Sequence, residues 1–351
     1  MRLYDSKLWL SDIDETIENL PDINELAGKS LLITGCSGLI CSTIIDVIVH
    51  WNRTHNEKIK ILAAGRNEKK INQRFDPYYK EEWFAFLSYD ACSIETIVSC
   101  PCDYIIHGAS NASPNKIVEE PVETMLSNFL GMRVLLEQAK SNWTERVLYI
   151  SSSEIYGRKE GNQPYKTNDY GYIDLLNARN SYSIGKRAAE TLCASYAAEY
   201  GVDSVIVRPG HIYGPTAVES DNRVASAWAY DVARGKDIVL KSDGSQIRSY
   251  CYCLDGASAI FKVLLKGKSN NAYNISNPNS IITVRRLAEI LAECAGVQVR
   301  MELPSEIEKK GFNPMDNSSL DSSALEKLGW RGLFNAERGL HHTVSIIRGD
   351  V

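Results

Sequence analysis

A tyrosine and a lysine with the spacing of an activated phenol stand in the middle of the chain, at Tyr182 and Lys186. One helical turn separates them, so both side chains project from one face of the predicted helix. A cationic amine beside a phenol favours the phenolate and lowers the phenol pKa from about 10 towards neutrality, where it acts as a general base. Upstream lie a turn with two spaced glycines and the serine cluster Ser151-Ser152-Ser153-Glu154. This order predicts dehydrogenase-type chemistry on a bound nicotinamide nucleotide.

The spaced glycines, Gly35 and Gly38, lie between an apolar run and a helical pattern. A turn of this kind lets the backbone approach a pyrophosphate, and the helix N-terminus supplies free amides and a partial positive charge. Cys41 stands where a third glycine would be expected, at a position that serves helix packing rather than phosphate contact. An ordinary tight turn is the alternative for an isolated motif. The predicted cofactor contacts of this turn are Gly35, Cys36, Ser37, Gly38, Leu39 and Ile40.

The second predicted strand ends in Gly65-Arg66, where an acid that binds the ribose hydroxyl is usual. A guanidinium favours a 2′-phosphate, so Arg66 favours NADP over NAD. Stacking of Arg66 on the adenine is the alternative.

Apolar runs and helical patterns alternate through the first two thirds of the chain, which predicts an α/β fold with a doubly wound parallel sheet. The ligand crevice should lie beyond the carboxyl ends of the strands. The expected strands are residues 30–35, 59–64, 85–89, 103–107, 146–151 and 204–208, and the expected helices between them include 39–51, 122–140 and 182–200.

Three regions follow from this pattern. Residues 1–29 form an N-terminal helical extension that either packs on the surface or makes an oligomer contact. Residues 30–208 form the dinucleotide-binding domain, to which segments near 248–265 return. Residues 209–351 form mainly a smaller substrate-binding lobe, with helices expected at 226–234, 254–265, 284–295 and 322–328.

Composition excludes several classes of function. The formal charge is -5 and 44% of residues are hydrophobic, which argues against a nucleic-acid partner. No apolar run approaches the roughly 20 residues that span a bilayer, and the N-terminus does not resemble a secretory signal. We therefore expect a cytoplasmic protein without a membrane partner. The nine cysteines contain no Cys-x-x-Cys pair. Cys100/Cys102 and Cys251/Cys253 alternate as strand residues would, which favours buried thiols over disulfides or a metal site.

Taken in order, the motifs resemble the extended short-chain dehydrogenase/reductases that modify nucleotide sugars, from Lys29 to Trp330. Among members, the chain looks most similar to UDP-glucuronate decarboxylases and sugar 4,6-dehydratases. The segments that carry the resemblance are residues 34–40, 107–114, 149–157, 182–187, 208–215, 242–250 and 328–330.

The resemblance implies transient oxidation of the sugar at C4. Tyr182 would take the proton of the 4-hydroxyl while hydride leaves for the nicotinamide. Lys186 would hold the ribose and lower the pKa of Tyr182, and Ser152 would donate to the C4 oxygen. The remaining roles implied are cofactor contacts for Asp90, Ala109 and Ser110, a supporting role for Asn128, a diphosphate clamp for Arg248 and Arg223, and substrate contacts for Ser113 and His211.

Glu154 bears on the reaction type, because a 4-keto intermediate acidifies the C5 proton and a carboxylate can remove it. Ser153 stands where dTDP-glucose dehydratases have an acidic residue. GDP-mannose dehydratases and the decarboxylases, like this chain, have a serine there. Decarboxylases have an arginine near positions 317 and 318 that binds the sugar carboxylate, whereas this chain has Asn317 and Ser318. A structural hydrogen bond is the alternative role for Glu154.

Other departures from the family pattern concern the substrate side. His211 and Ala227 replace asparagines, and His211 is either a substrate contact or a turn histidine. We expect a 4,6-dehydratase or related lyase, with a 4-epimerase, a UDP-glucuronate decarboxylase and a cofactor-binding regulator without turnover as alternatives. The resemblance also implies a homodimer formed through the helices that start near Val122 and Tyr182.

Overall fold

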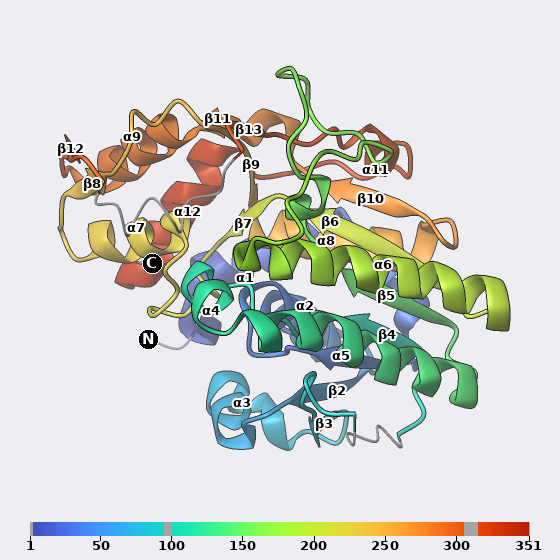
Figure 1. The fold of residues 1–351 in the computed structure, drawn as a ribbon. Coiled ribbons are helices and arrows are strands. Elements are labelled where there is room, and N and C mark those ends of the chain that lie inside the picture. The colour runs from blue at the N-terminus through green and yellow to red at the C-terminus, as the bar shows by residue number, and fades with distance from the viewer. Residues whose placement is uncertain (1–2, 95–99, 305–314, 351) are drawn as a thin grey trace.

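A seven-stranded parallel sheet forms the centre of the molecule in the computed structural model, which describes residues 3–94, 100–304 and 315–350 (Figure 1). Each strand has apolar residues on both faces, because successive side chains point to opposite sides. In spatial order the strands are β10 (Ala272–Ile275), β6 (Ser204–Pro209), β5 (Arg146–Ile150), β4 (Tyr104–His107), β1 (Ser30–Thr34), β2 (Lys60–Gly65) and β3 (Phe84–Ser88).

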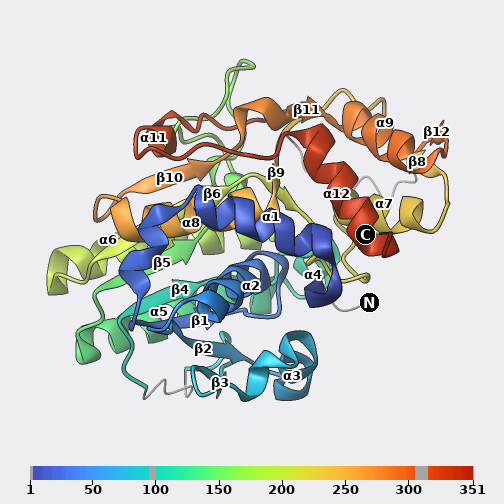
Figure 2. The ribbon, with the colours of Figure 1, turned by 180° about the vertical axis from the view of Figure 1, so that it is seen from behind.

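Helices cover both faces of this sheet. Leu31 and Ile33 of β1 pack into the core on one face, whereas Leu32 packs into the core on the other. The first face is covered by α1 (Lys7–Glu18), α2 (Leu39–Thr54) and α8 (Cys253–Lys266), seen in Figure 2. The second is covered by α5 (Pro121–Asn142) and α6 (Ser181–Tyr200), seen in Figure 1. The short α3 (Glu68–Phe75) follows β2.

The predicted doubly wound parallel sheet is confirmed, and each of the six expected strands lies within one residue of the observed one at both ends. β10 joins the large sheet beside β6, although its segment was expected in the smaller lobe. Of the two cysteine pairs interpreted as strand residues, only Cys251 lies in a strand, β9 (Ile247–Tyr252), and the interpretation was wrong for the other three. Cys100 and Cys102 lie in the connection before β4, and Cys253 begins α8. All nine cysteines are free thiols.

The N-terminal helix α1 is part of the packed core. Ser6 caps it by accepting a hydrogen bond from the backbone N of Trp9 at 3.2 Å. Trp9 and Ile13 are fully buried, and Asp12 accepts hydrogen bonds from Tyr252 and His342. Residues near both ends of the chain are thereby held against the central domain.

A smaller lobe lies beyond the carboxyl ends of the central strands (Figure 1). Its sheet joins β7 (His211–Tyr213), β9 (Ile247–Tyr252), β11 (Ile281–Thr283) and β13 (Asn317–Ser318), and β8 (Ile238–Leu240) pairs with β12 (Val299–Met301). The helices that follow β7 and lie outside the central domain's α8 are α7 (Val224–Ala233), α9 (Val284–Ala295), α11 (Ser323–Glu326) and α12 (Ala336–Arg348). The short helix α4 (Pro114–Glu119) lies earlier in the chain, between β4 and α5.

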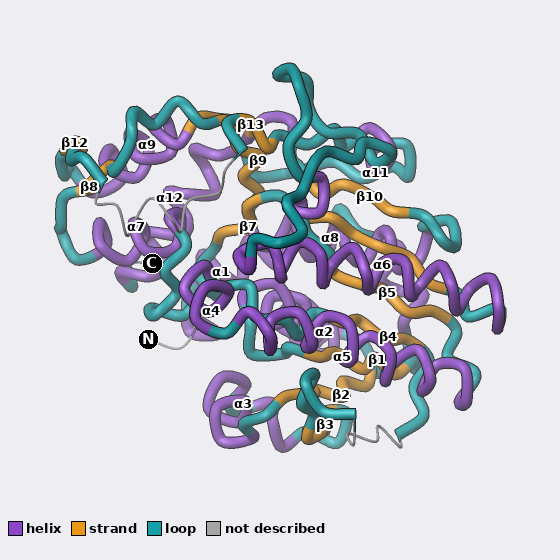
Figure 3. The backbone as a smooth tube through the Cα atoms, in the orientation of Figure 1, coloured by secondary structure: helices purple, strands orange, loops and turns teal. Residues whose placement is uncertain are grey.

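A long connection between β5 and α6 begins with a short helix, η4 (Ser153–Tyr156), and ends with another, η5 (Ala178–Asn180). Between them the chain is loop, as the teal tube at the top of Figure 3 shows. Within the described ranges no helix combines the length and apolarity needed to cross a membrane. The same residues contain no cluster of side chains suited to a metal ion.

Candidate active site

The turn after β1 comes close to the backbone of the segment that follows β4. Gly35 has a φ of +68°, and a Cβ there would lie 2.8 Å from backbone atoms of Gly108 and Ala109. Gly38 is the N-cap of α2. Cys41 is buried in the first turn of α2, and its sulfur occupies the space beside Gly108. The side chain of Cys41 therefore packs α2 against the end of β4, at Gly108 directly after the strand, in the helix-packing role that the sequence predicted.

A cavity of about 220 Å³ lies over this turn and the adjacent strand ends. The predicted residues Arg66, Asp90, Ala109 and Ser110 line it, whereas Leu39 and Ile40 do not. Leu39 is buried in the core beneath the turn. The lining consists of Gly35, Cys36, Ser37, Gly38, Gly65, Arg66, Tyr89, Asp90, Ala91, Cys92, Gly108, Ala109, Ser110, Asn111 and Ser127.

The lining of this cavity fits the pyrophosphate and adenosine part of a dinucleotide. The glycine turn and the N-terminus of α2 form an anion cradle. The turn approaches the segment after β4 so closely that a Cβ at Gly35 would meet its backbone. The hydroxyl of Ser110 is buried in the cavity wall and has no protein partner among the described residues. A buried hydroxyl of this kind is one that a ligand or water satisfies.

Tyr182 and Lys186 lie on the buried face of α6 next to the end of β5. The Lys186 Nζ donates a hydrogen bond to the backbone O of Ile150 at 2.7 Å. It also lies 4.8 Å from the ring centroid of Tyr149 and 5.7 Å from that of Tyr182. The hydroxyl of Tyr149 in turn donates to Asn128 of α5 at 3.2 Å. The end of β5 thus holds the Lys186 amine close to the ring of Tyr182.

The pKa values of this pair differ from the expectation of a lowered phenol pKa. Burial, followed by the charge of Glu154, raises the pKa of Tyr182 to about 12, while Ser152 lowers it through a hydrogen bond. Burial also lowers the pKa of Lys186 to about 7, although the charge of Glu190 acts in the opposite direction. Burial disfavours the charged form of both groups. The prediction that Lys186 lowers the pKa of Tyr182 is therefore wrong for the protein without a bound nucleotide.

The serine cluster forms the wall next to Tyr182. Ser152 and Ser153 are buried, and the Ser152 hydroxyl accepts a hydrogen bond from the backbone N of Glu154 at 3.1 Å. The Glu154 carboxylate accepts two hydrogen bonds from Arg179, at 3.0 and 3.3 Å. Arg179 was missed by the sequence analysis. It lies three residues before Tyr182, and only the folded chain brings it to Glu154.

The predicted substrate-side residues come from separate elements of the smaller lobe. Arg248 of β9 is buried and donates to the backbone O of Ile247 and Asp316, at 2.9 and 3.2 Å. Burial lowers the pKa of His211 to about 3, with further lowering from the charges of Arg248 and Arg223. These three side chains therefore share one electrostatic environment.

Two of the predicted substrate-side groups are engaged with neighbours. Arg223 pairs with Asp221 through its Nε at 2.9 Å. The hydroxyl of Ser113 donates to Asn222 at 3.1 Å and so links the segment after β4 to the segment before α7. Arg223 also lowers the pKa of Tyr182, which places its charge within reach of the candidate catalytic group.

Comparison with known proteins decides the family. The profile of the NAD dependent epimerase/dehydratase family matches residues 31–276. The chain belongs to this family. It is an NAD-dependent epimerase/dehydratase family enzyme, and the match covers both the glycine turn and the Tyr182/Lys186 pair.

Curated relatives of this family member include UDP-glucuronic acid decarboxylase 6 of Arabidopsis thaliana, which is 28% identical over 88% of this chain and 86% of the relative. A trifunctional UDP-glucose 4,6-dehydratase of the same plant is 28% identical over 90% of this chain and 47% of that longer protein.

Solved structures with the same fold include a UDP-glucose 4-epimerase from Thermotoga maritima with UDP-glucose. Its TM-score is 0.78 at 22% identity, covering 92% of this chain and 99% of the epimerase. A dTDP-glucose 4,6-dehydratase from Bacillus anthracis in complex with NAD has a TM-score of 0.76 at 18% identity, covering 92% of this chain and 97% of the dehydratase. The family description names NAD, so the preference for NADP expected from Arg66 finds no support here.

Proposed function

We propose that this enzyme modifies a nucleotide-diphosphate sugar through transient oxidation at C4, followed by proton removal from C5. The observation that carries the proposal is the position of the Glu154 carboxylate, whose charge acts on Tyr182 from the same wall as Ser152. A phenol, a hydroxyl and a carboxylate gathered at one strand end provide a base for the 4-hydroxyl, a donor for its oxygen and a second base.

We propose NAD as the cofactor. The glycine turn and Ser37 would hold the pyrophosphate, and Asp90 would bind the adenine end of the cavity. Lys186 would hold the ribose nearest the sugar. When bound, the nicotinamide supplies an acceptor for the hydride that leaves C4. Arg66 lines the cavity and is exposed, so it would lie beside the adenosine.

In the proposed oxidation the proton of the 4-hydroxyl passes to the Tyr182 oxygen, while the C4–H bond breaks and its electron pair leaves as hydride. Ser152 donates a hydrogen bond to the C4 oxygen. Because burial raises the pKa of Tyr182, the phenolate form depends on positive charge brought close to it. Arg223 and Arg179 already act in that direction.

Among the reactions that begin this way, the carboxylate at Glu154 favours a lyase, with a 4,6-dehydratase first. A UDP-glucuronate decarboxylase is the second candidate, supported by relatives with that name at 28% identity. The arginine expected for that reaction is absent: Asn317 of β13 instead donates its side-chain amide to the backbone O of Asn162. A 4-epimerase would use Tyr182, Lys186 and Ser152 in the same way without needing Glu154.

The test is mass spectrometry of nucleotide sugars after incubation of the purified protein and NAD with UDP-glucose, UDP-glucuronate, GDP-mannose, dTDP-glucose and CDP-glucose. Loss of water identifies a dehydratase and loss of carbon dioxide a decarboxylase. An isobaric product that chromatography separates identifies an epimerase. Tyr182→Phe should abolish each of these products. Unchanged sugars with every substrate, together with retained NAD binding, would favour a binding protein without turnover.

We also propose that two copies associate through α5 and α6. Val122, Met125 and Leu126 near the start of α5 are apolar and 62%, 40% and 39% exposed. Neighbouring apolar side chains on one helix end are typical of an association surface. A monomeric mass by light scattering at micromolar concentration would contradict the proposal.

A further inference from the structure

The guanidinium of Arg179 binds the Glu154 carboxylate. Arg179 lies at the end of the connection between β5 and α6, directly before α6 begins. Arg179 Nη1 lies 3.0 Å from Oε2 and Nη2 lies 3.3 Å from Oε1, which is the two-pronged arrangement of a strong ion pair. The hydroxyl of Ser183 adds a longer contact of 3.4 Å to Oε2. The side chains of Arg179 and Glu154 are 13% and 25% exposed, so solvent screens the pair little.

The same pair acts in opposite directions on the candidate proton acceptor. The charge of Glu154 raises the pKa of Tyr182, and the charge of Arg179 lowers it. An unpaired carboxylate beside Tyr182 would therefore oppose its ionisation. Pairing with Arg179 therefore offsets part of the effect that the Glu154 charge has on the pKa of Tyr182.

Local capping fixes the backbone of Arg179. It lies in η5, where the side chain of Asn177 accepts a hydrogen bond from the Arg179 backbone N at 3.0 Å. The Asn180 amide donates to the backbone O of Asp174 at 2.8 Å. These contacts lock the chain directly before α6 starts, so the guanidinium reaches Glu154 from a defined direction.

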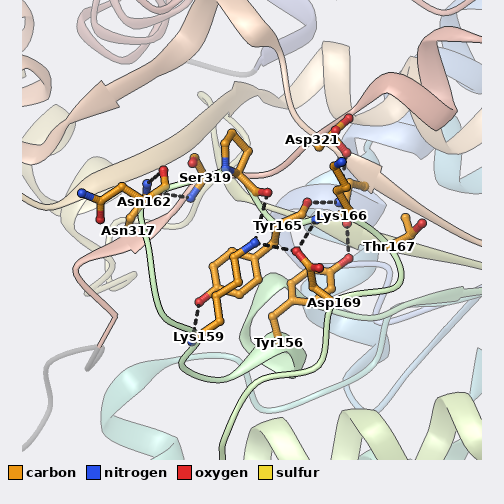
Figure 4. Close-up of polar contacts among 12 residues, drawn as sticks. Tyr156, Lys159, Asn162, Tyr165, Lys166, Thr167, Asp169, Asn317, Ser319 and Asp321 are labelled. Atoms are coloured by element: carbon orange, nitrogen blue, oxygen red, sulfur yellow. Dashed lines mark hydrogen bonds and ion pairs between the residues drawn. The ribbon is translucent and has the colours of Figure 1, made fainter.

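The rest of the connection is anchored on the C-terminal half of the chain, as Figure 4 shows. The backbone N of Tyr165 donates to Ser319 O at 2.8 Å, and the Asp321 N donates to Tyr165 O at 2.9 Å. Within the connection, Lys159 pairs with Asp169 at 2.6 Å. Residues 159–169 of the connection are thus held against the C-terminal half.

We propose that Arg179 is a positioning residue that aims the Glu154 carboxylate for proton removal from C5; this rests on the proposed function. In that step the C5–H bond breaks, the proton passes to a Glu154 oxygen, and the electron pair moves to the C4 carbonyl oxygen. The Nε of Arg179 is buried without a partner in the described part of the chain, and a bound sugar hydroxyl would satisfy it.

The experiment separates the two proton transfers. Wild type, Arg179→Met and Arg179→Lys are incubated with NAD and UDP-glucose in deuterium oxide, or with whichever sugar from the panel above the wild type converts. The near-ultraviolet absorbance change that accompanies hydride transfer reports C4 oxidation, and deuterium at C5, measured by NMR, reports the step of Glu154. Arg179→Met should slow C5 exchange roughly 10- to 100-fold. C4 oxidation should slow by a smaller factor, because loss of the Arg179 charge acts on that step only through the pKa of Tyr182.

Arg179→Lys should recover part of the C5 exchange, and added guanidinium ion should recover part of it in Arg179→Met. In a Glu154→Gln background, Arg179→Met should have no further effect on C5 exchange. Arg53→Met, at the exposed end of α2, is the matched control and should leave both steps unchanged.

The possible failures are distinguishable. No C4 oxidation by wild type with any sugar would overturn the proposed function and the inference with it. C4 oxidation by wild type without C5 exchange would leave the oxidation standing and overturn the role of the pair. If wild type performs both steps, then equal loss of both in Arg179→Met and Arg179→Lys, or unchanged C5 exchange in Arg179→Met, would overturn the inference alone.

Discussion

Replacement of Lys186 by methionine should stabilise the protein in the absence of nucleotide while it destroys the site. Lys186 is 2% exposed, and burial lowers its pKa from 10.5 to about 7. A shift of that size corresponds to roughly 5 kcal/mol of destabilisation where the lysine is charged in both the folded and the unfolded protein. Loss of the hydrogen bond to Ile150 O offsets about 1 to 3 kcal/mol of the gain.

The pH dependence tests this reasoning more sharply than the absolute value. Below about pH 7 the folded and unfolded states both carry the proton, so the full penalty applies. Between about pH 7 and 10.5 the unfolded state holds a proton that the folded state has released, so the free energy of unfolding of wild type rises with pH. Above 10.5 both forms are neutral and the penalty is gone.

The assay is urea denaturation of nucleotide-free wild type and Lys186→Met at about pH 6 and about pH 9. The stability advantage of the variant should be about 3 kcal/mol larger at the lower pH. Lys69→Met, on the exposed surface of α3, is the control and should show no such difference between the two pH values. A variant that is less stable than wild type by the same amount at both pH values would refute the argument that burial of charge dominates this site.

Two further predictions concern the cofactor cradle and the buried ion pair between Arg208 of β6 and Glu190 of α6. Gly35→Ala should lose bound NAD, measured as nucleotide released on denaturing the purified protein, because its Cβ would meet Gly108 at 2.8 Å and its φ of +68° is unfavourable by about 1 to 2 kcal/mol; retention of a stoichiometric nucleotide would contradict the cradle. Arg208→Met should lower the free energy of unfolding by about 3 to 5 kcal/mol, since it leaves Glu190 buried without the guanidinium that it contacts at 2.6 and 3.0 Å. Adding Glu190→Gln to Arg208→Met should recover part of the loss, and a denaturant midpoint unchanged by Arg208→Met would show that the pair is not needed.

The amino-acid sequence by itself determined the alternating fold and the local motifs. Short apolar runs between helical patterns specify strands buried on both faces, and the position of Gly35 between a run and a helix specifies the turn. The spacing of Tyr182 and Lys186 places them on one helical face through local geometry alone. Each of these features depends on neighbours within a few residues.

Only the tertiary structure decided the electrostatics of the site and the partner of Glu154. The ionisation of Tyr182 and Lys186 depends on how deeply the sheet and helices bury them, which pairwise spacing does not encode. Arg179 and Glu154 are 25 positions apart in the chain, and the packing of α6 against η4 brings the two together. The attachment of β10 to the large sheet likewise depends on pairing with β6, since a short apolar run carries no record of its partner strand.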